Sequence, residues 1–359
     1  MPKNLTIKEI AALADVSVST VSRVINHKPS VRPDKERRVR QVIKENGFQP
    51  SMVARSMVSK KTNTLAVIVP DITSPYFTAL IAQIELNSKE AGYTLLLFNT
   101  MTAGRTQSAG AASEEVGVFT LVQEKKVDGV IILGGEIDRE VPDPRYLAGL
   151  NTLSERIPTV IVGHPVADCK ALFIERNEKL ATQVVTAHLL ATGYRRIGFV
   201  GGEPGIKITT MRLNAFESAM TLYADYDPEA VFLSDYYIQD GYESMQRLLQ
   251  SDRPVEAVVA INDRVALGAI RAAKDAGKDV PQDIAVASCE LFPDGEWDIP
   301  RLTTVDYHND ILGRAAVLTL IKMIDGETPE APVIADPQLV IRESCGNLLK
   351  RQARAAKNE

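Results

Sequence analysis

Hydrophobic and polar positions in the first 50 residues follow the period of α-helices. Apolar residues recur at helical spacing over residues 7–14, behind a capping box that begins at Thr6, and this predicts a first short helix. After a tight turn, Ser17 is a suitable N-cap for a second helix ending at Ile25, and a third is predicted to start near Pro33. Two helices joined by a short turn, with a third closing the core, are typical of a helix-turn-helix domain.

The second helix is predicted to have one apolar face and one face of short polar side chains. The face opposite its buried stripe carries Val18, Ser19, Ser22, Arg23 and Asn26. Such short side chains let a helix approach a DNA groove closely, and Arg can bind guanine O6 and N7 with two hydrogen bonds. Because an ordinary solvated face would favour Glu and Lys, the pattern favours contact with DNA.

From residue 64 onward, runs of Val, Ile and Leu alternate with helical stretches. Runs such as TLAVIVP, GVIILGG, RIGFVGG, AVVAIND and TTVDY predict buried strands, and their spacing predicts βαβ units with parallel sheets. Seven or eight such units exceed one ordinary sheet, so we expect two similar lobes in series. Ligands bind beyond the carboxyl ends of such strands, which predicts a shared cleft between the lobes.

Charge is distributed unevenly along the chain. Residues 1–61 hold 13 Lys and Arg against 5 Asp and Glu, a net charge of +8. The whole chain of 359 residues carries −5, so the other 298 residues carry −13. A basic head on an acidic body indicates a polyanionic partner, with a merely solvated basic face as the alternative.

The sequence lacks the patterns of catalytic, metal-binding and membrane proteins. Its three cysteines are widely spaced without a CxxC, and its four histidines are scattered, so we expect no cofactor, metal site or disulfide. The stretch VGGEPGIK lacks the spacing of a phosphate loop, and no GxSxG occurs. No apolar run approaches the roughly 20 residues that span a bilayer, and no secretory signal is visible. We expect a cytoplasmic protein that is not an enzyme and has no membrane partner.

The segments LTIKEIAALADVSVSTVSRVIN and GFQPSMVARSM resemble the LacI/GalR family of bacterial transcription regulators. The family pattern V-S-x-x-T-V-S-R-V-x-N is matched in full by residues 16–26. The resemblance implies that Val18, Ser19 and Arg23 read base edges in the major groove. The DNA contacts expected from the head are Thr6, Ser17, Val18, Ser19, Thr20, Ser22, Arg23, Asn26 and Arg32. Arg32 departs from the usual Ser, and since Arg is a poor N-cap we expect a phosphate to hold it.

Residues 50–62 resemble the family's hinge helix, which orders when two copies pair on DNA. Their apolar stripe is too small to fold alone, because isolated helices this short are marginal in water. Met57 matches the position whose side chain wedges into the minor groove, which would kink the duplex, and Ala54 and Arg55 match its usual neighbours. A flexible linker whose Met residues pack on the body is the alternative.

The body resembles the periplasmic-binding-protein fold that the family uses as a sensor, in which the chain crosses between lobes three times. The resemblance implies an α/β fold with a helix-turn-helix head over 1–49 and an effector-binding and dimerisation domain over 63–345. Within that domain we expect lobe one over 63–177 and 307–329, lobe two over 178–306 and 330–345, and a frayed tail over 346–359.

Candidate effector-binding residues follow the predicted strands. The resemblance assigns Arg212 to ligand hydroxyls or carboxylates and Tyr236 to an aromatic platform, which suits the apolar face of a sugar. Asn262 and Asp263 match a family motif at a strand end. The expected set is Asp71, Ser74, Tyr76, Phe77, Arg176, Arg212, Tyr236, Asn262, Asp263 and Glu290. For each of them a structural cap or a core contact is the alternative.

Two departures from the family pattern bear on the ligand. Glu290 stands where the family often has Asp, with a side chain one methylene longer, and Arg176 stands where the family favours Asp. Together with Asp71 and Asp263, these residues leave no strongly cationic pocket. We therefore expect a neutral or singly charged sugar rather than a bisphosphate.

Together the patterns predict a sequence-specific DNA-binding repressor controlled by a small-molecule effector, a sugar or sugar derivative, bound between two lobes. A two-fold homodimer would place two reading helices about one turn of DNA apart on a pseudo-palindromic operator. The alternative is a sugar-binding protein or sugar-acting enzyme of the same lobed fold without a DNA role. Because such proteins need a signal peptide or a catalytic constellation, the sequence favours the regulator.

Arg23→Ala is expected to weaken operator binding by about 1–3 kcal/mol and to relax the preference at one base pair, because the guanidinium would read one guanine. Anisotropy titrations with the operator, its single-base variants and random DNA measure both effects. An equal loss on random DNA would make Arg23 a phosphate contact instead.

Met57→Gly should weaken operator binding more than nonspecific binding, because a minor-groove wedge acts only where the duplex kinks. The same titrations, compared between operator and random DNA, measure the difference. If both weaken equally, residues 50–62 are a plain linker.

Overall fold

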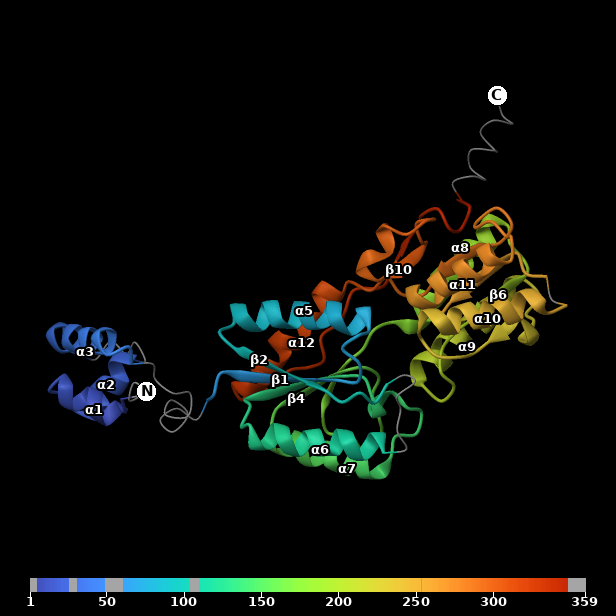
Figure 1. The fold of residues 1–359 in the computed structure, drawn as a ribbon. Helices are drawn as coiled ribbons and strands as arrows, with labels where there is room; N and C mark the ends of the chain where they lie inside the picture. Colours follow the sequence, from blue (N-terminus) through green and yellow to red (C-terminus); the bar gives the residue numbers. More distant parts are fainter. Residues whose placement is uncertain (1–4, 26–30, 49–60, 104–109, 253, 348–359) are drawn as a thin grey trace. The chain divides into compact units, whose positions relative to one another are not determined.

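The computed structural model describes residues 5–25, 31–48, 61–103, 110–252 and 254–347. The chain divides into two compact units, a head over residues 1–62 and a body over residues 63–359 (Figure 1). The head is helical, and the body is an α/β unit with two parallel sheets.

Three helices build the head: α1 (Ile7–Leu13), α2 (Val18–Ile25) and α3 (Pro33–Glu45). The capping box forms as predicted, since the Thr6 hydroxyl accepts the backbone N–H of Glu9 and the Glu9 carboxylate accepts that of Thr6 at 2.6 Å. Ile10, Val21 and Val39, one from each helix, are fully buried in one hydrophobic cluster. This small core holds α2 with its polar face outward.

Lobe one of the body is a five-stranded parallel sheet in the order β2-β1-β3-β4-β5. Its strands are β1 (Thr64–Val69), β2 (Thr94–Asn99), β3 (Gly129–Leu133), β4 (Thr159–Val162) and β5 (Leu172–Ile174). Its helices are α5 (Pro75–Glu90), α6 (Ala111–Glu124), α7 (Pro144–Arg156) and α12 (Asn309–Ile324).

Alternating side chains of the strands build two cores, one on each face of this sheet. Leu65, Val67 and Val69 of β1 pack with residues of α5 and α12. Ala66 and Ile68 point to the other face and pack with α6 and α7. Figure 1 shows the two helix pairs on opposite faces of the sheet. Burial on both faces explains why β1 is a continuous apolar run.

Lobe two is a four-stranded parallel sheet in the order β7-β6-β8-β9. Its strands are β6 (Ile197–Val200), β7 (Val231–Phe232), β8 (Ala257–Ala260) and β9 (Ala285–Ser288). Its helices are α8 (Glu178–Thr192), α9 (Lys207–Tyr223), α10 (Ile238–Gln250) and α11 (Asp263–Asp275). Every residue of β6, β8 and β9 is buried, so this sheet too has helices on both faces.

The run TTVDY is not a strand of either parallel sheet. Thr303 makes one parallel bridge to Ala287 of β9. The next residues, β10 (Thr304–Asp306), pair antiparallel with β11 (Gln338–Val340) in a separate two-stranded sheet. The prediction of a parallel strand is wrong here, because this segment leaves lobe two and leads to α12, which packs on β3 and β4 of lobe one.

Two glycines let α10 and α11 pack with their backbones in contact. A Cβ added to Gly268 of α11 would lie 1.8 Å from the carbonyl oxygen of Ile238. One added to Gly241 of α10 would lie 2.0 Å from the carbonyl oxygen of Val265. Backbone atoms in a packed interior have no room to move aside, so both positions require glycine.

Gly268→Ala is expected to lower the free energy of unfolding by about 1–3 kcal/mol or more, because the new methyl group forces the two helices apart. Gly117→Ala is the matched control, since a Cβ at this helical position in α6 meets nothing within 4 Å. It should be neutral or stabilise by about 0.5–1 kcal/mol. Urea unfolding measures both variants, and similar effects at the two sites would contradict the packing argument.

Candidate functional site

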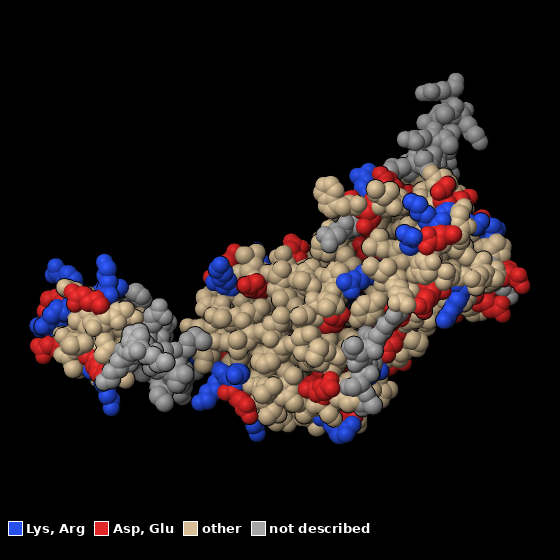
Figure 2. All heavy atoms as spheres, viewed as in Figure 1, with Lys and Arg blue, Asp and Glu red and all other residues tan. Residues whose placement is uncertain are grey.

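The outer face of α2 is open to solvent. Val18 is 41 % exposed, Ser19 and Arg23 are exposed, and Ser22 is half-buried. The Arg23 guanidinium makes no hydrogen bond or ion pair with any described residue, so its N–H donors remain available to an external acceptor. Figure 2 shows Lys and Arg side chains projecting from the edge of the head, with Asp and Glu between them. This helix can present a polar, cationic face to a groove.

Hydroxyl groups order the start of α2. Ser17 Oγ lies 2.8 Å from Ser19 Oγ and 2.9 Å from Thr20 Oγ1, and it accepts the backbone N–H of Thr20. Arg32 precedes α3, is exposed and caps the helix with no side-chain hydrogen bond. Thr6 is exposed and is the N-cap of α1. The other four candidate DNA contacts lie outside the described residues: Asn26, Ala54, Arg55 and Met57.

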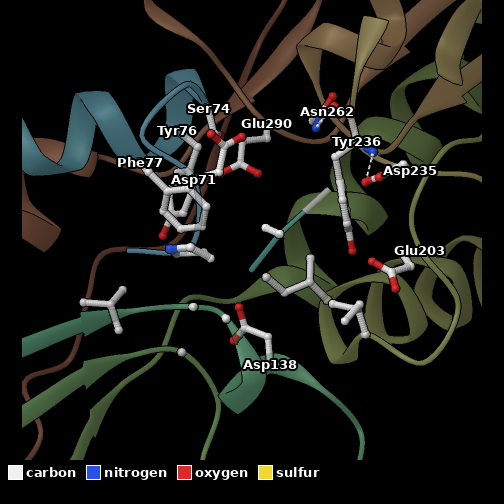
Figure 3. Close-up of a pocket in the computed structure, with 18 of the residues that line it drawn as sticks. Asp71, Ser74, Tyr76, Phe77, Asp138, Glu203, Asp235, Tyr236, Asn262 and Glu290 are labelled. Carbon is white, nitrogen blue, oxygen red and sulfur yellow. Dashed lines mark hydrogen bonds between the residues drawn. The ribbon is translucent and has the colours of Figure 1, made fainter. Parts of the chain in front are cut away.

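In the described part of the body, the carboxyl ends of all nine strands of the two parallel sheets reach the same cavity. Figure 3 shows this cavity from close by. The lining residues that follow β1 to β5 include Asp71, Thr102, Gly134, His164 and Arg176, and those that follow β6 to β9 include Glu203, Tyr236, Asn262 and Glu290. Open parallel sheets bind ligands at these ends, so two sheets here serve one site.

The cavity has aromatic walls and the size of a small ring. Tyr76 and Phe77 pack together with ring centroids 4.9 Å apart on one side, and Tyr236 lies on the other (Figure 3). The Tyr236 hydroxyl is 2.6 Å from Thr209 Oγ1, which fixes the ring. The volume of about 150 Å³ is comparable with an engineered protein cavity that holds one benzene molecule.

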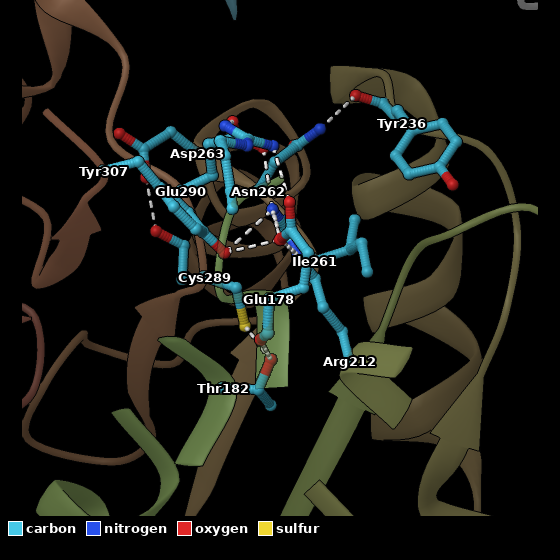
Figure 4. A network of polar contacts seen from close by, with 12 residues as sticks. Glu178, Thr182, Arg212, Tyr236, Ile261, Asn262, Asp263, Cys289, Glu290 and Tyr307 are labelled. Carbon is cyan, nitrogen blue, oxygen red and sulfur yellow. Dashed lines mark hydrogen bonds and ion pairs between the residues drawn. The ribbon is translucent and has the colours of Figure 1, made fainter. Parts of the chain in front are cut away.

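The floor of the cavity is a closed ring of ion pairs between two arginines and two glutamates. Figure 4 labels Glu178, Arg212 and Glu290 of this ring. This charge ring consists of Arg176, Glu178, Arg212 and Glu290. Arg176 contacts Glu178 Oε1 at 2.8 Å and Glu290 Oε1 at 2.7 Å. Arg212 contacts Glu178 Oε2 at 2.6 Å and Glu290 Oε2 at 3.0 Å. Each carboxylate therefore gives one oxygen to each guanidinium.

Two tyrosines complete the charge ring. The Arg176 guanidinium carbon lies 4.4 Å from the ring centroid of Tyr76 and 4.2 Å from that of Tyr307. The Tyr307 hydroxyl donates to Glu178 Oε2 at 2.6 Å. Burial opposes ionisation of Glu178, but the two guanidinium groups and this hydroxyl outweigh it and lower the pKa of Glu178 to about 2. Glu178 is thus ionised at neutral pH.

Nine of the ten expected effector residues line the cavity. Besides those in the charge ring and Tyr236, Asp71 and Asn262 have their polar atoms engaged within the protein. The Asp71 carboxylate accepts Thr73 N–H at 2.7 Å and the Tyr237 hydroxyl at 2.9 Å. Asn262 caps α11, accepting the N–H of Val265, and donates to the Tyr236 carbonyl oxygen at 3.1 Å. Asp71 thus links lobe one to lobe two, and Asn262 positions the Tyr236 platform.

Asp263 is the tenth expected effector residue. It was expected to line the cavity, but it does not. Its carboxylate is buried and accepts the Thr304 hydroxyl at 2.7 Å, the Phe292 backbone N–H at 2.9 Å and the hydroxyl of Ser288. Burial raises the pKa of Asp263 to about 7, although these three donors oppose the rise. The contacts to Ser288 and Phe292 flank Glu290, so Asp263 positions the loop that carries Glu290.

Sequence reasoning missed Asp138, which points into the cavity from lobe one (Figure 3). Its carboxylate has no hydrogen bond to any residue in the described part of the chain. Burial raises the pKa of Asp138 to about 6, against the pull of Lys207. The glycine pair that ends GVIILGG was the available signal, because Gly134 and Gly135 have φ of +73° and +97° and turn the chain into the cavity.

The buried carboxyl group of Glu115 stabilises the turn at Gly134 and Gly135 through hydrogen bonds. Glu115 Oε1 accepts the Thr102 hydroxyl at 2.6 Å and the Glu136 backbone N–H at 3.1 Å. Burial raises the pKa of Glu115 to about 7 despite these donors. Glu115 therefore joins the segments after β2 and β3, which no sequence pattern indicated.

Comparison with known proteins finds two family matches in chain order. Residues 6–51 match the bacterial regulatory proteins of the lacI family, and residues 186–345 match a periplasmic binding protein-like domain. The chain is 31 % identical to the HTH-type transcriptional repressor PurR of Histophilus somni, over 96 % of this chain and 99 % of the relative. It is 29 % identical to the HTH-type transcriptional regulator CelR of Thermobifida fusca, over 94 % and 98 %.

Solved structures share the fold over nearly the whole chain. A lac repressor dimer bound to operator and the anti-inducer ONPF has a TM-score of 0.84 at 22 % identity and covers 96 % of this chain and 99 % of its own. A complex of the regulator CelR with cellobiose has a TM-score of 0.68 at 26 % identity and covers 95 % and 99 %. With these matches to both units and a relative above 30 % identity along its full length, the chain belongs to the lacI family of bacterial regulatory proteins.

Proposed function

We propose that this DNA-binding regulator acts as a repressor and that a sugar or sugar derivative in the body cavity controls its affinity for DNA. The observation that carries the proposal is the convergence of nine strand ends on one cavity lined by aromatic rings and carboxylates. Such a cavity is a ligand site rather than a packing defect, because a core void would be lined by apolar groups.

The chemistry of the lining suits a hydroxylated ring. Tyr76, Phe77 and Tyr236 offer flat apolar surfaces to the C–H face of a sugar. The Asp138 carboxylate and the half-buried Ser74 hydroxyl, neither of which has a hydrogen-bond partner in the described residues, can accept or donate at the ring hydroxyls. The cellobiose complex of a structural relative supports the same ligand class.

On the DNA side, we propose a homodimer that places two copies of α2 in successive major grooves of a pseudo-palindromic operator. Two apolar side chains of lobe one, Leu86 of α5 and Leu97 of β2, are 51 % and 46 % exposed and could be covered by a second copy. Figure 2 shows a largely uncharged area over α5. The operator-bound dimer of the lac repressor supports this arrangement.

The two lobes offer a route for control. Arg176 and Tyr307 lie on the segments that join the lobes, between β5 and α8 and between β10 and α12. A ligand that changes the angle between the lobes would move lobe one, where the body begins. By linkage, ligand and operator then change each other's affinity by the same factor.

The proposal includes no catalytic step and no cofactor, and it locates the protein in the bacterial cytoplasm, on the nucleoid when bound to DNA. No helix in the described ranges is long and apolar enough to cross a bilayer. Among the same residues no group of three or more His, Cys, Asp and Glu is arranged to hold a metal ion. The lacI-type head disfavours the alternative of a sugar-binding protein or enzyme without a DNA role.

Thermal unfolding with a panel of monosaccharides and disaccharides, cellobiose among them, tests the ligand. A bound sugar at 100 times its Kd should stabilise the protein by about 2.7 kcal/mol. Tyr236→Ala should abolish the shift, because it removes the aromatic platform, whereas Tyr223→Ala, at a 64 % exposed tyrosine of α9 outside the cavity, should retain it. A panel without any shift, or a shift that survives Tyr236→Ala, would contradict a sugar site in this cavity.

Selection of DNA from a random pool by the full-length protein tests the regulator. We expect an enriched pseudo-palindrome whose affinity changes when the stabilising sugar is added. Enrichment of unrelated sequences, or an affinity that the sugar leaves unchanged, would contradict a ligand-controlled operator.

A further inference from the structure

The charge ring gives the floor of the cavity a formal charge of zero. Its two guanidinium groups each contact both carboxylates at 2.6–3.0 Å, and all four side chains are at most 9 % exposed. A buried guanidinium is an anion site only while its charge is not compensated. In this cavity Glu178 and Glu290 compensate both.

An anionic ligand would also meet an acidic wall. Seven lining residues carry carboxylates, against four with guanidinium groups. Of the remaining two arginines, Arg139 pairs with Glu136 Oε2 at 3.1 Å, whereas Arg264 donates to the Thr73 carbonyl oxygen at 2.8 Å, a neutral acceptor that does not compensate its charge. Among the described lining residues, a phosphate or carboxylate on the ligand would therefore approach seven carboxylates, and Arg264 is the one guanidinium group there without a carboxylate partner.

An uncharged hydroxyl group meets no such penalty. It can donate to a carboxylate oxygen and accept from a guanidinium N–H at the same time. We propose that Glu290, together with Glu178, sets the charge selectivity of this cavity, which admits uncharged hydroxylated ligands and excludes phosphorylated or acidic ones. The inference rests on the proposed ligand site and narrows the class of its ligand.

Glu290 is the position at which this selectivity can be changed with least disturbance. Asp263 holds the backbone on both sides of it through Ser288 and Phe292, so a side chain of the same shape should keep its place. Glu290→Gln removes one negative charge and keeps an oxygen that can accept from Arg176 or Arg212. The ring would then carry a net charge of one positive unit.

Titration of full-length protein with inorganic phosphate, at constant ionic strength and followed by calorimetry, tests the proposal. Glu290→Gln should bind phosphate at least about tenfold more tightly than the wild-type protein. The control Glu343→Gln removes a carboxylate that pairs with Arg301 at 3.0 Å on the surface, outside the cavity, and should behave as the wild type. Phosphate that binds the basic head is the same in all variants and cancels.

The double variant Glu290→Gln/Arg176→Gln restores a neutral ring and should lose the gained phosphate binding. Equal phosphate affinity of the wild type and a folded Glu290→Gln, or a gain that persists in the double variant, would overturn the proposal. If Glu290→Gln does not fold, the wild type decides by itself. If the wild-type protein binds phosphate and Arg212→Gln abolishes this binding, the proposal is overturned. If the wild-type protein binds a neutral sugar but shows no such phosphate binding, the proposal is sustained. If the wild-type protein and all variants fail to bind DNA, the proposed regulatory function is refuted, but the charge selectivity of the cavity is not.

Discussion

The architecture of the cavity depends on one interaction, the charge ring at its floor. Four ionised side chains in a water-poor site would be strongly unfavourable if any of them lacked a partner. Each carboxylate oxygen here has a guanidinium contact of 3.0 Å or less, so the charges compensate one another locally. Removing any single member would leave a buried charge uncompensated, which is why the ring constrains every element that contributes to it.

The elements that contribute come from both lobes and from the segments between them. Arg212 lies on α9 and Glu290 follows β9 in lobe two, whereas Arg176 and Tyr307 lie where the chain passes between lobes. Tyr76 of α5 adds a contact from lobe one, with its ring 4.4 Å from the Arg176 guanidinium carbon. A ligand that rests on this floor touches the point at which the lobes are joined. The site is therefore well placed to sense the angle between them.

Around the floor, the fold separates residues that hold the site from residues that can reach a ligand. Asp71, Asn262 and Asp263 resemble ligand-binding residues by type, yet each has its polar atoms engaged by the protein. Asp138 and the aromatic walls remain for the ligand. The head shows the same separation of roles. Val21 and Val24 of α2 are buried and hold the helix, whereas Arg23 of the same helix is exposed and can reach a partner.

The sequence by itself determined the local structure and the family. A capping box, a helical period and an eleven-residue motif act within a few turns of chain, so Thr6, Ser17 and Arg23 could be placed without a fold. The parallel sheets followed from apolar runs, because burial on both faces leaves no polar position in a strand. The prediction of a parallel strand for the segment TTVDY was wrong, because its backbone pairs antiparallel with residues more than 30 positions later.

Only the tertiary structure decided which polar residues face the ligand. Glu178 is separated from Glu290 by 112 positions, and no local pattern states that they share two arginines. Asp263 turned away from the cavity because Ser288, Phe292 and Thr304 converge on it, and Asp138 turned inward because two glycines precede it. Hydrogen-bond partners distant in sequence set these orientations, and their positions exist only once both sheets have formed.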